Sequence, residues 1–394
     1  MSGVPPHGVP PHGVPLHGGD PSVLRRLNSV ATLRALRGAG ETTLTELANR
    51  LSLSRPTTEG ALSELAARGL VEEVAPDAGR RLGRPARRYR FRAEAGYALG
   101  IEINANRTLA YAADLDGRVV GRHRAELEVG WTSRERLSAV RATVRSCLDD
   151  AGVDRSRLWA VAAGTPGVID SGGRVAICTV VPDWQGVHLA RELGRGFPFP
   201  VLVENDANLA AVAERWRGAA QNVDDMVYVL AGLHTGAGVV IGGRLHRGRW
   251  GAAGEVGTLP ELGLRDTATE LAGFGAPPGP EKRADRAAEQ VLTAARTGDP
   301  AALARVDQVA GRMARGIAAM VLALDPEMVI VGGALTLAGD VLVAELRRHL
   351  QPLCLGPTRI EASTLGDESV GLGAVRLALD RIEEDLLRLD AASP

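Results

Sequence analysis

Two acidic and two amide side chains lie close together in the middle of the chain, in the segment Glu204-Asn-Asp-Ala-Asn208. Amide and carboxylate oxygens can hold vicinal hydroxyl groups, and an aspartate can also take a proton from one of them. Apolar residues before this segment predict a buried strand, and Ala/Leu-rich residues after it predict a helix. A strand followed directly by a helix exposes polar side chains and free N–H groups in one crevice, so we predict a ligand site at Asn205 and Asp206. The alternative is that Asp206 only caps the helix.

The length allows two or three domains, and the composition is ordinary for a chain with sizeable cores. The chain has 394 residues, 45% of them apolar, and a net charge of −1, so any basic character must be local. Its three cysteines are far apart and form no C-x-x-C pair, which predicts free thiols in a reducing compartment. No apolar run approaches the roughly 18 residues that span a membrane, and no signal-peptide pattern is present. We therefore expect a cytoplasmic protein with no membrane partner.

Residues 1–20 repeat a five-residue unit, beginning with Gly3-Val-Pro-Pro-His7. Proline and glycine at this density cannot form a regular hydrogen-bonded ladder or a core, so we predict a disordered tail. Its three regularly spaced histidines could bind a metal, but no acidic or thiol ligand accompanies them. We therefore expect no metal site in this tail.

Residues 21–94 have the pattern of an α+β DNA-binding domain. Leucine and valine at helical spacing predict a first helix, the capping box Thr43-Leu-Thr-Glu46 opens a second, and Ser54 caps a third. Two helices joined by a short turn form a helix-turn-helix, whose second helix enters the major groove of DNA. Strands at 69–74 and 89–91 then complete a β-hairpin wing. Together these elements predict a winged helix-turn-helix domain.

Arginine is concentrated in this first domain. Residues 21–92 contain fourteen arginines and seven acidic residues, a local surplus of positive charge in a nearly neutral chain. Such a patch is typical of phosphate binding, although arginine runs can also be solvated faces. Gly83-Arg84-Pro85 suits an arginine laid along a narrow minor groove. The predicted DNA contacts are Arg55, Thr57, Thr58 and Ser63 in the third helix, and Arg80, Arg81, Arg84, Arg87 and Arg88 in the wing.

Residues 95–394 resemble the ROK family (repressors, open reading frames and kinases). The resemblance rests on the Gly164-Thr-Pro-Gly167 turn, the Glu204–Asn208 segment and three further segments: the predicted strands between 98 and 126, Leu233–Gly238 and Gly251–Thr258. It implies an actin/hexokinase-like α/β fold of two lobes, about 95–222 and 223–394, with sugar bound between them. Some family members are sugar kinases, and others are sugar-responsive repressors with an added DNA-binding domain.

The resemblance also implies which residues bind the sugar. Asn205 and Asp206 would hold sugar hydroxyls, with Glu255 as a third ligand and Glu270 as a fourth. Thr258 stands where the family has a sugar-binding histidine. In a kinase, Asp206 would be the base that deprotonates the attacking hydroxyl.

Two family motifs are missing. The phosphate-binding turn Asp-x-Gly-Gly-Thr is replaced by Glu102, Asn104, Ala105 and Asn106, so both glycines and the threonine are lost. The family's Cys-x-Cys-Gly-x-x-Gly-Cys zinc loop is also lost, because residues 259–268 contain no cysteine and no histidine. We therefore expect neither ATP nor zinc as a cofactor.

These features together predict a transcriptional regulator rather than an enzyme. We expect a repressor of carbohydrate metabolism that binds a double-stranded DNA operator as a homodimer or homotetramer. A sugar or sugar phosphate in the non-catalytic, kinase-like cleft would modulate its DNA affinity. Two alternatives remain open: a DNA-binding regulator whose second domain has lost sugar binding and serves dimerisation or another effector, and an ATP-dependent sugar kinase.

Overall fold

The computed structural model describes residues 21–74, 87–232, 235–264, 267–272, 281–333 and 340–387. The chain divides into two units, one made of residues 1–93 and 384–394 and the other of residues 94–383. None of the described helices is long and apolar enough to cross a membrane. The predicted tail of residues 1–20 lies outside the described residues.

The first unit has three helices and a small sheet. The helices are α1 (Pro21–Leu36), α2 (Leu44–Leu51) and α3 (Arg55–Ala67). The sheet has the order β1-β3-β2, from β1 (Thr42–Thr43), β3 (Arg88–Phe91) and β2 (Val71–Val74). Its core includes Leu36, Leu47, Leu62 and Leu65, each no more than 2% exposed. The predicted winged helix-turn-helix is confirmed.

Local hydrogen bonds fix the turn of the helix-turn-helix. Thr43 and Glu46 form the predicted capping box at the start of α2, and the Ser54 side chain accepts a hydrogen bond from the backbone N–H of Thr57. Between these helices Ser52 has a φ of 54°. Glycine is the usual residue in this left-handed conformation, because a side chain is strained there.

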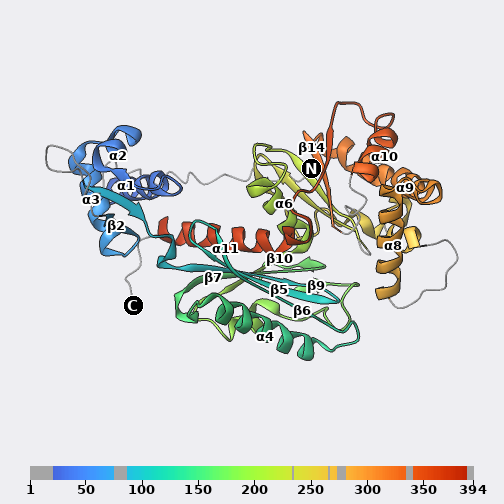
Figure 1. The fold of residues 1–394 in the computed structure, drawn as a ribbon, viewed down its shortest axis with the longest axis horizontal. Helices are drawn as coiled ribbons and strands as arrows, with labels where there is room; N and C mark the ends of the chain where they lie inside the picture. The colour runs from blue at the N-terminus through green and yellow to red at the C-terminus, as the bar shows by residue number, and fades with distance from the viewer. Residues whose placement is uncertain are drawn as a thin grey trace, which may run out of the picture. The chain divides into compact units, whose positions relative to one another are not determined.

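Lobe 1 of the second unit is a five-stranded sheet covered by helices on both faces (Figure 1). The strand order is β10-β7-β4-β5-β6, from β4 (Tyr97–Ile103), β5 (Arg107–Asp114), β6 (Val119–Glu126), β7 (Leu158–Thr165) and β10 (Val201–Asn205). Helices α4 (Ser133–Ala151) and α5 (Leu189–Gly194) pack into the core on one face. Helix α11 (Ser369–Leu387) lies on the other face, where a Cβ at Gly100 of β4 would collide with the backbone of Gly371.

Lobe 2 repeats the same strand pattern. Its order β13-β12-β11-β14-β15 combines β11 (Met226–Leu230), β12 (Gly236–Ile241), β13 (Arg244–Leu245), β14 (Met328–Gly332) and β15 (Arg359–Ala362). In both sheets an antiparallel hairpin precedes strands that join in parallel. The lobe 2 core is completed by α7 (Thr267–Ala272), α8 (Glu281–Arg296), α9 (Pro300–Leu324) and α10 (Asp340–Leu350).

Helix α6 (Asp206–Arg217) contacts both sheets, because it packs on β7 and β10 of lobe 1 and on β11 and β12 of lobe 2. A short hairpin, β8 (Val168–Ile169) with β9 (Val175–Ile177), lies beside β10. The first turn of α6 therefore lies where the two lobes meet. The predicted two-lobe α/β fold is confirmed by this topology.

Candidate functional site

Asn205 caps helix α6 and fixes the turn between β10 and the helix. Its Oδ1 accepts a hydrogen bond from the backbone N–H of Asn208 at 3.0 Å, and its Nδ2 donates to the backbone carbonyl of Gly167 at 3.1 Å. The alternative that Asp206 caps the helix is therefore wrong, since Asn205 is the capping residue. This geometry joins the predicted Gly-x-Pro-Gly turn to the start of α6 and orients Asp206 as the first helical residue.

The side chain of Glu204, which is only 7% exposed, stabilises this turn by hydrogen bonds. Its Oε1 accepts hydrogen bonds from the backbone N–H of Asn205 and from Nδ2 of Asn208, both at 2.9 Å. Its other oxygen pairs with Arg247, which follows β13 in lobe 2. Glu204, Asn208 and Arg247 were not among the site residues predicted from the sequence. The first two belong to the Glu204–Asn208 segment, but no local pattern points to Arg247.

Burial and neighbouring charges act on the carboxyl group of Asp206. Its Oδ1 accepts a hydrogen bond from the backbone N–H of Ala207 at 2.8 Å. Burial, together with the neighbouring carboxylates of Glu102 and Glu255, raises the pKa of Asp206 to about 7. At neutral pH this group is therefore present in both protonation states, and it can accept hydrogen bonds from hydroxyls or take a proton from one.

Glu255 joins Asp206 at this site. It begins a short 3₁₀ turn (Glu255–Thr258), directly after Gly254, whose φ of 91° favours glycine. Burial raises the pKa of Glu255, and its charge raises the pKa of Asp206, so the two carboxyl groups share one low-dielectric region. Thr258 is exposed, and its hydroxyl donates to the backbone carbonyl of Glu255 at 2.8 Å.

Glu270 lies on α7 and forms an ion pair with Arg312 of α9, at 2.5 Å between Oε1 and Nη1. It also lines a cavity of about 230 Å³ with Arg305, Gln308 and Val309. These contacts match the common role of a helix-surface glutamate, and the role of Glu270 as a sugar ligand stays a prediction.

Two tryptophans have contrasting positions. Trp184 is fully buried and donates from Nε1 to the hydroxyl of Thr165 at 2.9 Å, so it is a core residue. Trp250 is 78% exposed, in the loop after β13. Both ends of this loop touch lobe 1, because Arg247 pairs with Glu204 and a Cβ at Gly251 would collide with the carbonyl of Ile169. Trp250 is therefore an exposed aromatic ring beside the junction of the lobes.

An ion-pair network joins the strands β4 and β5 on either side of residues 104–106, where the resemblance places the phosphate-binding turn of the kinases. Arg107 donates from Nε and Nη2 to Glu102 Oε1, both at 3.1 Å, and from Nη1 to Asp367 at 2.9 Å. Glu102 is 2% exposed, and burial raises its pKa while Arg107 opposes that change. Arg107 is thus already paired with two carboxylates.

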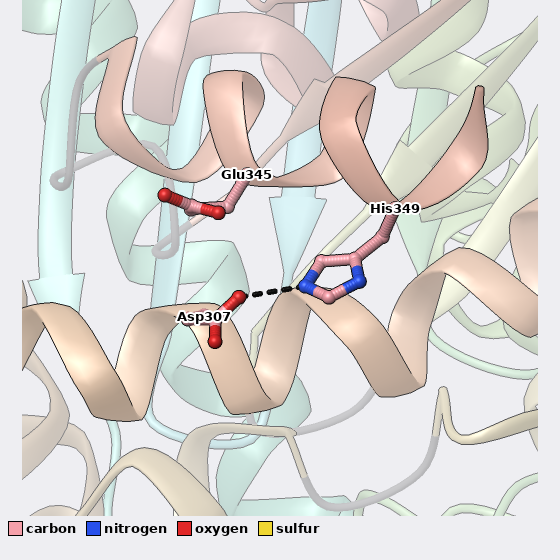
Figure 2. Close-up of side chains that lie close together, drawn as sticks. All are labelled: Asp307, Glu345 and His349. Atoms are coloured by element: carbon pink, nitrogen blue, oxygen red, sulfur yellow. Dashed lines mark hydrogen bonds and ion pairs between the residues drawn. The ribbon is translucent and has the colours of Figure 1, made fainter. Parts of the chain in front are cut away.

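The described residues include one group with metal-ligand side chains, shown in Figure 2. His349 Nε2 on α10 lies 2.7 Å from Asp307 Oδ1 on α9, and the ligand atoms of Asp307, Glu345 and His349 lie within 4.8 Å of one another. Arg348, however, pairs with both carboxylates. Because this cation already compensates their charge, we interpret the group as a network that joins α9 to α10.

Helix α3 exposes one face of the helix-turn-helix. Arg55 and Ser63 are exposed, so their contact with DNA stays a prediction, and Thr57 is half-buried with its hydroxyl 2.7 Å from that of Ser54. The prediction for Thr58 is wrong, because its side chain is fully buried and its hydroxyl donates to the carbonyl of Ser54 at 3.1 Å. Glu59 and Gly60 of α3 are also exposed and were not among the predicted contacts.

The described part of the wing also has exposed arginines. Arg88 points outward from β3, where residues alternate between exposed and buried. Arg87 is paired with Glu73 at 3.4 Å, but both side chains are at least half exposed, so this ion pair adds little stability and can exchange for a phosphate. Arg80, Arg81 and Arg84 lie outside the described residues.

Comparison with known proteins identifies both domains. The sequence pattern of the ROK family matches residues 98–381, and that of the MarR family matches residues 26–82. The xylose repressor of Caldicellulosiruptor bescii is 24% identical over 389 residues, which cover 92% of this chain and 97% of that protein. The glucokinase of Thermotoga maritima is 32% identical over 258 residues, covering 56% of this chain and 80% of that protein.

Solved structures show the same fold. A ROK family transcriptional regulator, described as a homolog of the E. coli MLC protein, matches with a TM-score of 0.71 and 19% identity, covering 93% of this chain and 98% of that one. A ROK family glucokinase from Streptomyces griseus, in complex with glucose and AMPPNP, matches with a TM-score of 0.60 and 26% identity, covering 72% of this chain and all of that one. Because the family pattern extends from β4 into α11, the chain belongs to the ROK family.

Proposed function

We propose that this protein is a sugar-responsive transcriptional repressor whose ROK domain binds a sugar without phosphorylating it. The observation that supports this most directly is the contrast between the two sides of the site. Asp206 and Glu255 remain together on the sugar side. On the phosphate side, Asn104, Ala105 and Asn106 replace the two glycines and the threonine of the family's turn, and Arg107 beside this turn is paired with Glu102 and Asp367.

The first domain supplies DNA binding. An exposed helix α3 preceded by a short turn is the arrangement that places a recognition helix in the major groove. Arg55 and Ser63 would contact DNA from the exposed face of α3, and Arg88 would contact phosphates from the wing. Two such helices in a homodimer or homotetramer would read two half-sites of one operator.

The second domain supplies the response to a sugar. The ionised carboxylates of Asp206 and Glu255 would accept hydrogen bonds from sugar hydroxyls, and one face of the sugar could stack on Trp250. A site built from charged acceptors discriminates between sugars, because a missing hydroxyl leaves a buried acceptor unpaired. The names of the relatives make xylose and glucose the first sugars to test.

The same geometry argues against catalysis. Phosphoryl transfer depends on positioning the nucleotide's phosphates, and backbone N–H groups in glycine-rich turns usually do this. Here the side chains of Asn104 and Ala105 replace the two glycines, and the Oδ1 of Asn104 accepts from the N–H of Ala105 at 2.7 Å. The residues between 259 and 268 do not fit the family zinc, since they include no cysteine or histidine. We therefore propose a protein with no ATP and no zinc.

A second candidate function is a DNA-binding regulator that no longer binds sugar. It is supported by Thr258, whose hydroxyl is engaged by the carbonyl of Glu255 where the family has a histidine. It is also supported by Asn205, both of whose side-chain polar atoms already bond to backbone groups. In this case the ROK domain would serve dimerisation or another effector.

One experiment separates these functions. The purified protein is titrated with D-xylose and D-glucose by isothermal titration calorimetry, and the same preparation is then assayed for ADP release with Mg-ATP and each sugar. The repressor proposal expects saturable binding of one sugar without ADP release, and loss of that binding in Asp206→Ala. Sugar-dependent ADP release would establish a kinase, and no binding of any sugar would favour the second candidate.

A further inference from the structure

Lobe 1 contains a cavity of about 540 Å³ beside helix α4, partly open to solvent. Its lining comes from α4, from the segment that follows α4, from the segment around the end of α5 and from Ile101 of β4. Small-molecule sites typically have volumes of about 300–1,000 Å³, so the cavity is large enough for a compact ligand. It shares no lining residue with the candidate sugar site.

One part of the lining is apolar. Val144, Leu148 and Leu193 belong to the lobe 1 core and also line the cavity, and half-buried Phe197 adds an aromatic ring. Apolar walls favour a ligand with an apolar body, because its burial removes hydrocarbon surface from water.

The other part of the lining is cationic. Four arginines line the cavity, and two of them are held by Glu192: Arg141 donates to its carbonyl at 3.0 Å, and Arg195 pairs with its carboxylate at 2.8 Å. Arg145 and Arg155 are exposed, and no carboxylate among the described residues forms an ion pair with either of them. Two guanidinium groups are therefore available to an anion.

The position of Arg155 is defined by its neighbours. Its guanidinium carbon lies 4.4 Å from the centroid of the Phe197 ring, a stacked cation–π contact. The adjacent acid, Asp154, is engaged by the N–H and hydroxyl of Ser156 at 2.7 and 2.6 Å. Asp149, the other acidic lining residue, is exposed on α4. A stacked, preoriented guanidinium is well suited to a carboxylate or phosphate group.

We propose that this cavity is a second ligand site, for an amphipathic organic anion that has a carboxylate or phosphate group on an apolar body. Arg145 and Arg155 bind the anionic group, and the apolar walls hold the body. Leu193 of α5 lines the cavity, and α5 packs on β10, the strand that ends at Asn205. An occupant therefore contacts a helix that supports the sugar-binding turn, which makes the site suited to a second effector.

The test is isothermal titration calorimetry of the full-length protein with 2-naphthoate and octyl phosphate. Neutral 2-naphthalenemethanol is the control for the apolar body without the anionic group, and inorganic phosphate is the control for the anionic group without the apolar body. We expect each amphipathic anion to bind at one saturable site, and each control to bind at least about tenfold more weakly. The double variant Arg145→Gln, Arg155→Gln should lose at least about tenfold in affinity for both anions. Arg191→Gln, which removes an exposed arginine outside the lining, should change neither affinity.

A second variant tests the geometry without removing a charge. A Cβ at Gly196 would collide with the guanidinium of Arg155, so Gly196→Ala should displace that group and weaken both anions severalfold. Thermal unfolding checks that each variant folds. Absent anion binding, equal binding of the neutral probe, or unchanged affinity in the double variant would each overturn the proposal. Sugar binding is measured separately, so such a failure would leave the proposed function intact.

Discussion

Replacing Asp206 by Asn should stabilise this protein at alkaline pH while abolishing its sugar response. Burial raises the pKa of Asp206 from 3.8 to about 7, so the folded state holds this proton over a pH range in which the unfolded chain has lost it. The free energy of unfolding therefore falls as pH rises from about 4 to 7, and above pH 7 the folded state keeps the full cost of holding Asp206 ionised. Asparagine keeps the oxygen that accepts from Ala207 but carries no charge.

The structure sets the size of this effect. A pKa displaced by about three units corresponds to about 4 kcal/mol when the carboxyl group is fully ionised. The side chain of Asp206 is half-buried, so water lowers this figure, and part of the cost is already present at pH 5. We expect Asp206→Asn to gain about 1–2 kcal/mol more, relative to wild type, at pH 8.5 than at pH 5.

Urea unfolding at pH 5 and pH 8.5 measures the difference directly. Glu261→Gln, which neutralises an exposed carboxylate, is the control and should behave alike at both pH values. An equal gain for Asp206→Asn at both pH values, or a loss of stability at pH 8.5, would refute the description of Asp206 as a half-buried carboxyl group with a raised pKa.

Four further predictions follow from the same contacts. Sugar affinity should rise with pH up to about 7, and sugar binding should release a proton, because sugar hydroxyls favour the ionised form of Asp206. Calorimetry at pH 6.5 in two buffers of different ionisation enthalpy measures the number of protons released, and a value of zero would contradict this prediction. Arg107→Ala should lower the free energy of unfolding, measured by urea unfolding, by about 3 kcal/mol, because it leaves buried Glu102 unpaired. Adding Glu102→Gln to this variant should restore part of the lost stability, and no restoration would count against the ion pair. Ser52→Gly should raise the stability of the first domain by about 0.5–1 kcal/mol in thermal unfolding, since it relieves a φ of 54°, and a lower melting temperature would contradict this. Gly60 is exposed on α3 with open space around it, so a longer side chain fits there. In fluorescence anisotropy Gly60→Glu should weaken DNA binding by about tenfold, because its negative charge repels phosphates, while Gly60→Lys should not weaken it. Equal effects of the two substitutions would place α3 away from DNA.

Local signals were sufficient to predict most elements of the fold. Helix α4 begins at Ser133 and ends at Ala151, because Thr132 and Glu135 form a capping box and Gly152 ends the helix in the left-handed conformation. Helix α9 likewise begins at Pro300, with Asp299 as its cap. Caps and apolar periodicity act within a few residues, so they can be read from one sequence.

Contacts between distant segments could not be predicted in this way. The pairing of Arg247 with Glu204 joins residues on different lobes, and neither neighbourhood contains a pattern that indicates the other. The burial of Thr58 likewise depends on how α3 packs against the rest of its domain, whereas the sequence shows only that it follows the helix start. The raised pKa of Asp206 also depends on distant segments, because Glu102 and Glu255 come from other parts of the chain.

The most direct test of the proposed repressor is fluorescence anisotropy on duplexes tiled from upstream of its own gene, at two salt concentrations, with and without the sugar found by calorimetry. We expect tight, salt-dependent binding to one duplex, a change of its affinity on adding that sugar, and no such change in Asp206→Ala. DNA affinity that no sugar alters in the wild-type protein would contradict the account, because the site at Asp206 would then have no coupling to the winged helix.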